Sequence, residues 1–292
     1  MTASYKNNSI TLPNATRAGY QFAGWYTSAS GGSRVGGNDS SYTPTATTTL
    51  YAQWTPNTYT IKFNGNGATS GSMSNLSMTY GTVKNLTSNA FSKTGYTFMG
   101  WGTSASDTSA NYSNGQSVNN LTTTNGATVN LYAIWRKTIT ITYNANGGSG
   151  APSSQTGYAY NSNTSTSITL SSTKPTKPTK TNYTFLGWST SSSAISATYQ
   201  QSTAYSFSSS TTLYAIWRRT ITITYNANSG SGAPSTTENM YNSATSVSIT
   251  LSSTKPTRTG YTFQGWATSL TATSATYSAG GKYSFSENTT LY

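Results

Sequence analysis

The side chains that most often carry catalysis are scarce in this sequence. Its 292 residues include no histidine and no cysteine, and the only side-chain carboxylates belong to Asp39, Asp107, Glu238 and Glu287. General acid–base catalysis normally needs one of these side-chain types close to a partner. Because the stretch 136–217 contains no acid at all, no carboxylate mechanism can be common to all parts of the chain. We therefore expect a protein that is not an enzyme.

Metal and cofactor sites also lack suitable ligands. Hard cations such as Ca²⁺ prefer clusters of carboxylate oxygens, and without cysteine there can be no disulfide and no thiolate site. The run Asn-Ala-Asn-Gly at 144–147 resembles half of a calcium loop, yet the lack of acids favours a turn there. The sequence thus predicts no catalytic residue, no cofactor and no metal site.

The chain is basic, with 16 Lys and Arg against 4 acids and a net charge of +12. Two interpretations stay open: the charges keep a weakly charged surface soluble and its strand edges unpaired, or they contact an anionic surface such as a wall polymer or a membrane. Nucleic acid is not expected as a partner, since no recognition motif accompanies the charge. The candidate anionic contacts are Arg136, Lys137, Lys174, Lys177, Lys180, Arg218 and Arg219.

One aromatic stretch of seven residues occurs four times, at 19–25, 95–101, 182–188 and 260–266, with the pattern Gly/Asn-Tyr-x-Phe-x-Gly-Trp. On a strand, the Tyr and the Phe point to the same face, whereas the Trp three residues later does not. A bulge at the intervening Gly would return the Trp to the buried face. The leading Gly or Asn predicts a turn with positive φ before the strand.

These stretches mark a repeat of about 80 residues, a length that suits a small independent domain better than a solenoid unit. A second marker, Leu-Tyr-Ala-x-Trp, ends at Trp54, Trp135 and Trp217. The expected domains are a partial module at 1–54 that lacks its first strand, full modules at 55–135 and 136–217, and a module at 218–292 that lacks its closing Ala-x-Trp.

Each module is expected to be mostly β, at the border of the α+β class. Alternation in the stretch 138–143 predicts a half-buried first strand, the Asn-x-Asn-Gly turn predicts a hairpin, and another strand is expected near 167–170. The loop after Gly-Trp contains few strong helix formers, so any helix there should be short. A tyrosine in this loop, such as Tyr199, should anchor it.

The repeated aromatics are interpreted as core rather than as sugar-binding platforms. Burying a Phe or Trp contributes about 2–3 kcal/mol, and an 80-residue domain without disulfides needs several such residues. The predicted structural core consists of Tyr20, Phe22, Trp25, Trp54, Tyr96, Phe98, Trp101, Trp135, Tyr183, Phe185, Trp188, Trp217, Tyr261, Phe263 and Trp266.

Taken together, Ile-x-Ile-x-Tyr-Asn-x-Asn-Gly-Gly, Tyr-x-Phe-x-Gly-Trp and Leu-Tyr-Ala-x-Trp resemble the Listeria–Bacteroides repeat, the repeat type of the internalin B B-repeat. The resemblance covers essentially the whole chain. It implies small β-grasp-like (ubiquitin-like) modules in the stalk of a bacterial surface adhesin. The Ser- and Thr-rich segment after Gly-Trp departs from the family pattern and puts the family's helix in doubt.

Three functions follow as hypotheses. The first is a non-enzymatic, extracellular spacer or adhesive stalk of a bacterial surface protein, shaped as an elongated rod because two-residue seams join its modules. The second is a module that binds a carbohydrate or an anionic wall polymer. The third is a subunit of an extracellular filament assembled by strand complementation. Partners would be a host or cell-surface glycan or protein, or neighbouring copies of the chain.

The expected location is the bacterial cell surface. No apolar run approaches the length of a membrane helix, and the first residues do not form a signal peptide. For an exported protein, the targeting and anchoring segments would therefore lie outside this chain.

Overall fold

The computed structural model describes residues 2–3, 8–176, 183–242 and 246–292. Throughout these residues, every regular element is a strand and no helix occurs. The fold is therefore all-β, which corrects the expectation of an α+β border. The helix that a β-grasp module would carry is not seen in this part of the chain, because a long Ser/Thr-rich coil stands in its place.

The chain divides into two compact units, and each is described by itself. Unit one comprises 1–137 together with 159–164, and unit two comprises 138–158 together with 165–292. We call the segments 1–54, 55–135, 136–217 and 218–292 repeats one to four.

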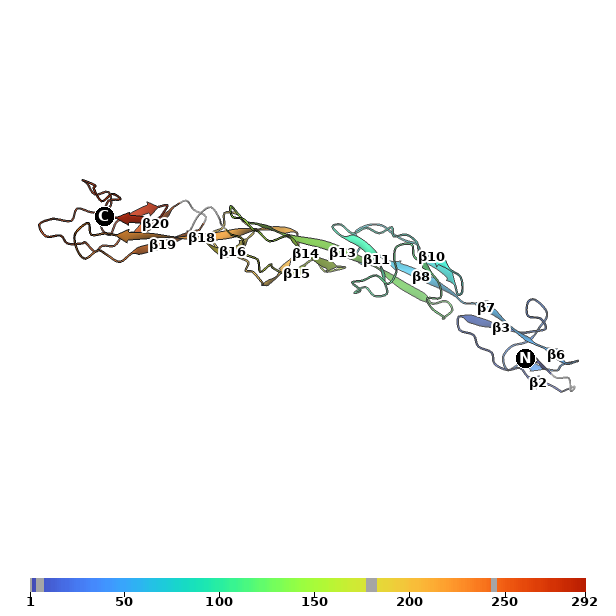
Figure 1. The fold of residues 1–292 in the computed structure, drawn as a ribbon. Helices are drawn as coiled ribbons and strands as arrows, with labels where there is room; N and C mark the ends of the chain where they lie inside the picture. Colours follow the sequence, from blue (N-terminus) through green and yellow to red (C-terminus); the bar gives the residue numbers. More distant parts are fainter. Residues whose placement is uncertain (1, 4–7, 177–182, 243–245) are drawn as a thin grey trace. The chain divides into compact units, whose positions relative to one another are not determined.

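Unit one contains the first twelve strands and the start of the thirteenth (Figure 1). They are β1 (Thr2–Ala3), β2 (Ile10–Thr11), β3 (Tyr20–Tyr26), β4 (Arg34–Gly36), β5 (Ser41–Tyr42), β6 (Thr48–Thr49), β7 (Tyr51–Pro56), β8 (Thr58–Asn64), β9 (Leu76–Thr79), β10 (Lys84–Asn85), β11 (Thr97–Gly102), β12 (Ser117–Val118) and β13 (Thr128–Asn144).

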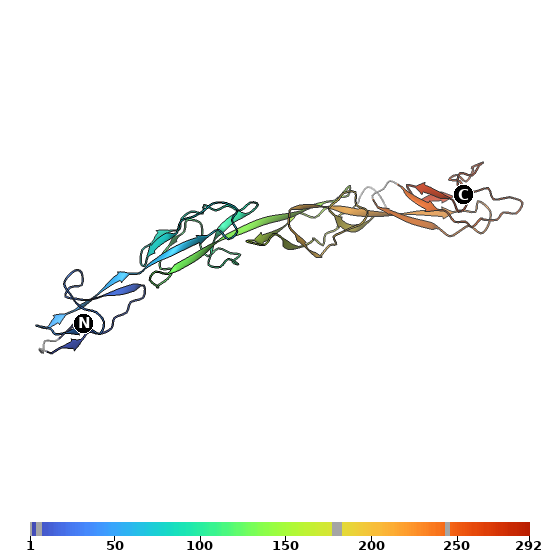
Figure 2. The same cartoon turned by 180° about the vertical axis from the view of Figure 1, so that it is seen from behind.

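Unit two takes the second half of β13 and the remaining strands (Figure 2 shows the same cartoon from behind). They are β14 (Gln155–Tyr160, whose last two residues belong to unit one), β15 (Thr166–Thr169), β16 (Tyr183–Ser189), β17 (Ala204–Phe207), β18 (Thr211–Tyr225), β19 (Thr237–Asn242), β20 (Val247–Thr250), β21 (Lys282–Phe285) and β22 (Thr289–Leu291).

Repeat two contains a mixed four-stranded sheet in the order β9–β8–β13–β11. The first strand, β8, runs parallel to the closing strand at the start of β13, and both outer pairs are antiparallel. Repeat three builds the same order, β14–β13–β18–β16. The alternating first strands are thereby confirmed, and each of them pairs with the next strand along the chain.

The bulge predicted in the aromatic stretch is present in the first three copies. The register of each aromatic strand shifts between the Phe and the Gly where it pairs with the closing strand. The φ angles of these glycines are positive: 139° at Gly24, 128° at Gly100 and 134° at Gly187. The predicted turn before the strand is also present, with φ of 79° at Gly19 and 77° at Gly95, while Asn182 lies outside the described residues.

The fourth aromatic stretch differs from this prediction, because 260–266 forms no strand. Its Gly265 keeps the bulge conformation, with φ of 141°. Next to this stretch, Ala267 and Tyr292 exchange two backbone hydrogen bonds, at 3.0 and 2.8 Å.

The hairpin partner of the first strand was predicted incorrectly. The segment near 167–170 does form a strand, β15, but β15 pairs with β17. The first strand of repeat three pairs instead with β14, which was missed. The signal was weak, since Gln-Thr-Gly-Tyr-Ala-Tyr contains a glycine and lacks the alternation of β-branched residues that marks strands.

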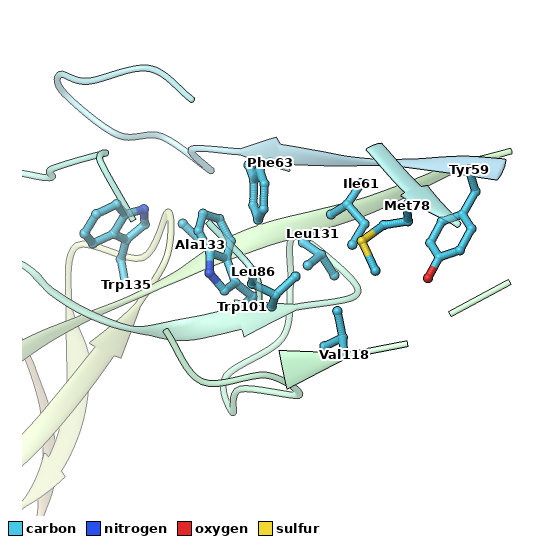
Figure 3. Close-up of a cluster of buried hydrophobic side chains, with 10 residues drawn as sticks. All are labelled: Tyr59, Ile61, Phe63, Met78, Leu86, Trp101, Val118, Leu131, Ala133 and Trp135. Atoms are coloured by element: carbon cyan, nitrogen blue, oxygen red, sulfur yellow. The ribbon is translucent and has the colours of Figure 1, made fainter. Parts of the chain in front are cut away.

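The core of each repeat lies between its main sheet and the coil that follows the aromatic stretch. Figure 3 shows the cluster of repeat two, in which Trp101 and Leu131 are completely buried among residues of β8, β9, β11 and β13. A tyrosine anchors the coil as expected: the backbone N–H of Trp101 donates to the carbonyl of Tyr112 at 2.8 Å, and Trp188 and Tyr199 repeat this bond.

Candidate functional site: the seams between repeats

Two of the acids, Asp107 and Glu238, accept hydrogen bonds from a loop and from a neighbouring strand of the chain itself. Asp107 Oδ2 accepts hydrogen bonds from the backbone N–H groups of Thr103 and Ser104, both at 2.9 Å. Glu238 Oε1 accepts one from the hydroxyl of Thr222 at 3.0 Å. No group of three acid, His or Cys side chains that could hold a metal occurs in the described part of the chain.

The predicted core residues are largely inside. The Trp residues of the four aromatic stretches are buried, with Trp25 8 % exposed and Trp101, Trp188 and Trp266 at 0 %. Of the other predicted core residues, Trp135 and Trp217 are buried, and Trp54 and the Tyr and Phe residues of the first three copies are half-buried, as is Phe263. The exception is Tyr261, which is 68 % exposed.

The two kinds of Trp have different surroundings. In the aromatic stretch, the indole N–H groups of Trp101, Trp188 and Trp266 have no hydrogen-bond partner among the described residues. The closing Trp instead donates to the turn that follows the first strand, from Trp135 Nε1 to Gly65 O at 2.7 Å and from Trp217 Nε1 to Ala145 O at 2.9 Å. In repeats two and three the closing Trp therefore holds the Asn-x-Asn turn, whereas Trp101 and Trp188 contribute by packing; in repeat one, Trp25 Nε1 donates to Pro13 O at 3.0 Å.

By seams we mean residues 55–57, 136–137 and 218–219, and the candidate functional region comprises the first and the third, each of which lies within one unit. At each seam the closing strand of one repeat leads into the first strand of the next. The seams are the places where hydrogen bonds and ring contacts join neighbouring repeats.

The first seam is interrupted at Asn57, between β7 and β8. Asn57 is buried, and its backbone N–H donates to Gly19 O at 2.9 Å while its carbonyl accepts from Tyr80 N at 2.8 Å. Its side-chain amide donates to Thr123 O at 2.6 Å. One side chain and its backbone thus connect repeat one with two loops of repeat two.

An aromatic contact closes the same seam. The ring of Tyr80, in the turn that follows β9, meets the ring of Tyr20 edge to face at 5.5 Å. Gly19 lies directly beneath it, and a Cβ atom at that position would come within 2.3 Å of the Tyr80 ring. The glycine is required there both by this close approach and by its φ of 79°.

The third seam has no interruption, because β18 runs through Arg218 and Arg219. These two residues have a strand on either side: β16 of repeat three pairs with them through Thr184 and Tyr183, and β19 of repeat four pairs with them as well. The guanidinium of Arg219 lies 5.6 Å from the centre of the Tyr183 ring and donates to Ser286 O at 2.9 Å.

Within unit one, the segment 159–164 provides a hub similar to Asn57. Asn161, which is 5 % exposed and has φ of 53°, accepts from the backbone N–H of Trp135 at 3.0 Å. Its amide donates to the carbonyls of Ala105 at 3.1 Å and Asp107 at 2.7 Å. Its own carbonyl accepts from Lys93 Nζ at 2.5 Å, and burial lowers the pKa of that Lys93 ammonium.

Sequence reasoning missed the contact that a cation two residues before the aromatic stretch makes with the Tyr ring of that stretch. In these turns the backbone N–H of the Tyr donates to the carbonyl of the cation, and the charged group lies over the Tyr ring. The pairs are Arg17 over Tyr20 at 3.8 Å, Lys93 over Tyr96 at 4.7 Å and Arg258 over Tyr261 at 4.2 Å. The spacing Lys/Arg-x-Gly-Tyr was a signal that could have found them.

The described members of the predicted set of anionic contacts differ in their local structure. Arg136, Lys137, Arg218 and Arg219 are half-buried in strands, and Lys174 is exposed in a loop. Lys177 and Lys180 lie outside the described residues. The four seam residues are therefore placed in strand ladders, where their side chains are only partly available to a partner.

Comparison with known proteins supports the division into repeats. The model of the Listeria-Bacteroides repeat domain matches at 1–53, 59–134, 140–216 and 222–292. This repeat occurs in tandem in bacterial surface proteins. A curated relative, a Gly-rich membrane protein of Evansella cellulosilytica, is 28 % identical over 277 residues, which cover 87 % of this chain.

The chain spans only 28 % of the length of that relative. In the described residues, no helix is long and apolar enough to cross a membrane. Four family matches in succession, each containing both aromatic markers or most of them, account for nearly the entire sequence. The chain belongs to the Listeria-Bacteroides repeat domain family.

Proposed function

We propose that the chain is an extracellular spacer or adhesive stalk of a bacterial surface protein and has no catalytic activity. The observation that carries the proposal is β18, which serves repeat three as its closing strand and repeat four as its first strand, with no linker between them. A stalk must keep its modules in a fixed relation, and a shared strand leaves little chain free to bend.

The distribution of polar and aromatic groups supports the same proposal. The aromatics that could stack on sugar rings are mostly buried in the repeat cores, so no specific observation favours the carbohydrate-binding alternative. The strand order β9–β8–β13–β11, with its central parallel pair, also supports β-grasp-like modules as the building block.

Small-angle scattering of the chain in solution tests the proposal. A single globule of this length would have a radius of gyration of about 19 Å by the usual scaling. We expect a clearly larger value, and a maximum dimension that shrinks stepwise when terminal repeats are removed. A radius near the globular value would contradict the spacer function.

A glycan array read at increasing salt concentration tests the main alternative. The spacer proposal expects no glycan to bind with a preference that survives salt, since the exposed cations are scattered. Selective, salt-resistant binding of one glycan class would favour a carbohydrate-binding module instead.

A further inference from the structure

Repeats two and three each begin and end on two strands that lie side by side and run parallel. In repeat two, β8 and the start of β13 pair from Thr60 with Thr128 to Asn64 with Tyr132. In repeat three, the end of β13 and the start of β18 pair in the same way. The chain therefore enters and leaves each of these repeats through a parallel pair of strands.

Tension along the chain loads such a pair in shear. The chain enters repeat two at Thr58, the first residue of β8, and leaves it after Trp135 in β13. Because the strands are parallel, these two points lie at opposite ends of the pair, so tension pulls the strands past one another. The evenly spaced bonds of a parallel ladder are then loaded together, whereas strands pulled apart from one end lose their bonds one at a time.

A side-chain oxygen extends the ladder at the end where the chain enters. The backbone N–H of Thr58 donates to Oδ1 of Asn125, in the loop before the closing strand, at 3.0 Å. In repeat three, the backbone N–H of Thr140 donates to the hydroxyl oxygen of Ser210, also at 3.0 Å. The first strand is therefore bonded to the closing segment beyond the residues that pair as strands.

Further bonds cross between the two strands at the other end of the pair. In repeat two, the amide of Asn66, in the turn after β8, donates to Ala133 O of β13 at 2.9 Å. In the opposite direction, Trp135 Nε1 donates to Gly65 O at 2.7 Å. The amide of Asn146 makes the equivalent bond to the closing strand of repeat three, at 3.0 Å. Side chains thus connect the first and the closing strand at both ends.

The core shields one face of this ladder from water. Ile61 and Phe63 of β8 and Leu131 of β13 belong to the buried cluster of repeat two, and Ile61 and Leu131 are completely buried (Figure 3). Inside a protein, a hydrogen bond is electrostatically stronger than in water. The burial therefore strengthens the bonds that shear must break.

We propose that the parallel pair of first and closing strand is a clamp that bears tension along the chain, and that the asparagine amide in the turn after the first strand is part of the clamp. The inference rests on the proposed stalk function, because a stalk is pulled along its length when its two ends are held. At the third seam, β18 transmits this tension from repeat three into repeat four without a linker.

Single-molecule force spectroscopy of the full chain tests the clamp, with DNA handles attached through thiols. The chain has no cysteine, so two introduced cysteines define the direction of pulling. Thr58→Cys with Thr138→Cys loads the pair β8 and β13 in shear. Thr58→Cys with Thr128→Cys pulls the same two strands apart from the end at which both begin. All three threonines are exposed.

The opening rate of repeat two at constant force should depend on the direction of pulling. The net contribution of one backbone hydrogen bond corresponds to about a fivefold change in rate. Because shear loads several of these bonds together, we expect the pair Thr58→Cys and Thr138→Cys to open at least about tenfold more slowly than the pair Thr58→Cys and Thr128→Cys at the same force.

Asn66→Gly tests the part played by the turn. Glycine tolerates the φ of 46° at this position, while the bond to Ala133 is lost. We expect opening in shear to become about fivefold faster, the change that one hydrogen bond corresponds to. Opening from the start of the strands should change little, since the lost bond would have broken last. The matched control is Asn146→Gly in repeat three, outside the loaded segment, which should change neither rate.

Equal opening rates for the two directions of pulling would overturn the clamp. An equal effect of Asn66→Gly in both directions would remove the asparagine from it, since such an effect would reflect a general loss of stability. Neither result contradicts the stalk, which the scattering experiment tests separately: a large radius of gyration with equal opening rates would leave a spacer without a clamp. Unchanged thermal unfolding of the cysteine variants verifies that the comparison is made on folded protein.

Discussion

The first and third seams join neighbouring repeats by different means. At the first seam the chain has three residues between the closing Trp54 and the first strand, one of them Pro56, whereas at the third it has two, both arginines. Because side chains alternate along a strand, one extra residue would send the next strand's apolar side chains to the wrong face. The strand therefore breaks at Asn57 in the first seam and continues through the third.

Different groups join the neighbouring repeats at the two seams. At the first, the buried amide of Asn57 and the Tyr80 ring hold the repeats together. At the third, the backbone ladder does so, and the arginine side chains lie on its flanks. We therefore expect side-chain substitutions to destabilise the first seam, and changes of the backbone to destabilise the third.

The largest expected effect comes from Trp188→Ala, in the core of repeat three. Truncating a buried Trp costs about 3–5 kcal/mol, comparable with the stability of a small domain. Because β18 belongs to both cores, we expect repeat four to lose protection together with repeat three. Trp25→Ala, the same change in repeat one, should leave repeat two folded.

Proteolysis followed by mass spectrometry measures, in both variants, how well each repeat is protected from cleavage. If repeat four of Trp188→Ala stays as protected as in the parent, the shared strand does not couple the two cores.

A backbone change at the third seam should have the next largest effect. Arg218→Pro removes an N–H from a strand that is paired on both sides, and we expect a loss of about 3 kcal/mol, as is typical for proline inside regular structure. Arg218→Ala keeps the ladder and should stay within about 0.5 kcal/mol of the parent. Chemical denaturation measures both, and equal losses would refute the assignment of coupling to the backbone.

At the first seam, the addition of a single methyl group at Gly19 should lower the stability of the protein. Gly19→Ala places a Cβ against the Tyr80 ring, while Gly95→Ala, at nearly the same φ, meets no atom within 4 Å. We expect Gly19→Ala to cost about 1–3 kcal/mol more, the usual penalty of overpacking. Tyr80→Ala in the same chain should remove most of the difference, as a double-mutant cycle would measure. An undiminished difference would show that Tyr80 is not the obstacle.

The bulge of the aromatic strand could be predicted from the sequence, whereas the contrast between the two seams could not. The Tyr-x-Phe-x-Gly-Trp pattern predicted the bulge at Gly100 because the parity of the Trp is wrong for a regular strand. The roles of Asn57 and Asn161 could not be predicted, since their partners lie in loops far away in the sequence. A local signal for Asn161 was its residue type: Gly81 and Asn161, in the turns that follow β9 and β14, both have positive φ.

The smallest expected effect is a pH dependence of stability that repeat three should show and repeat two should lack. Burial raises the pKa of the Tyr143 hydroxyl, partly offset by a hydrogen bond from Ser171. A raised folded pKa means stability that is present below about pH 10 and is lost as the pH rises through the folded value. Repeat two has Phe63 at this position and should lack the effect.

The variant Tyr143→Phe isolates that contribution. We expect its stability deficit relative to the parent, measured by denaturant unfolding, to shrink between pH 9 and pH 11. A deficit that stays constant over this range would mean that the hydroxyl does not titrate with unfolding.

Native-state hydrogen exchange of the intact chain tests the shared strand most directly. Amides that open only with a cooperative unit exchange with the free energy of that unit. We predict that the bonded amides of residues 216–221 exchange together, with one free energy common to the cores of repeats three and four. We also predict that the amide of Asn57 exchanges faster than these amides. Rapid exchange at Arg218 and Arg219, with separate free energies for the two cores, would contradict the account.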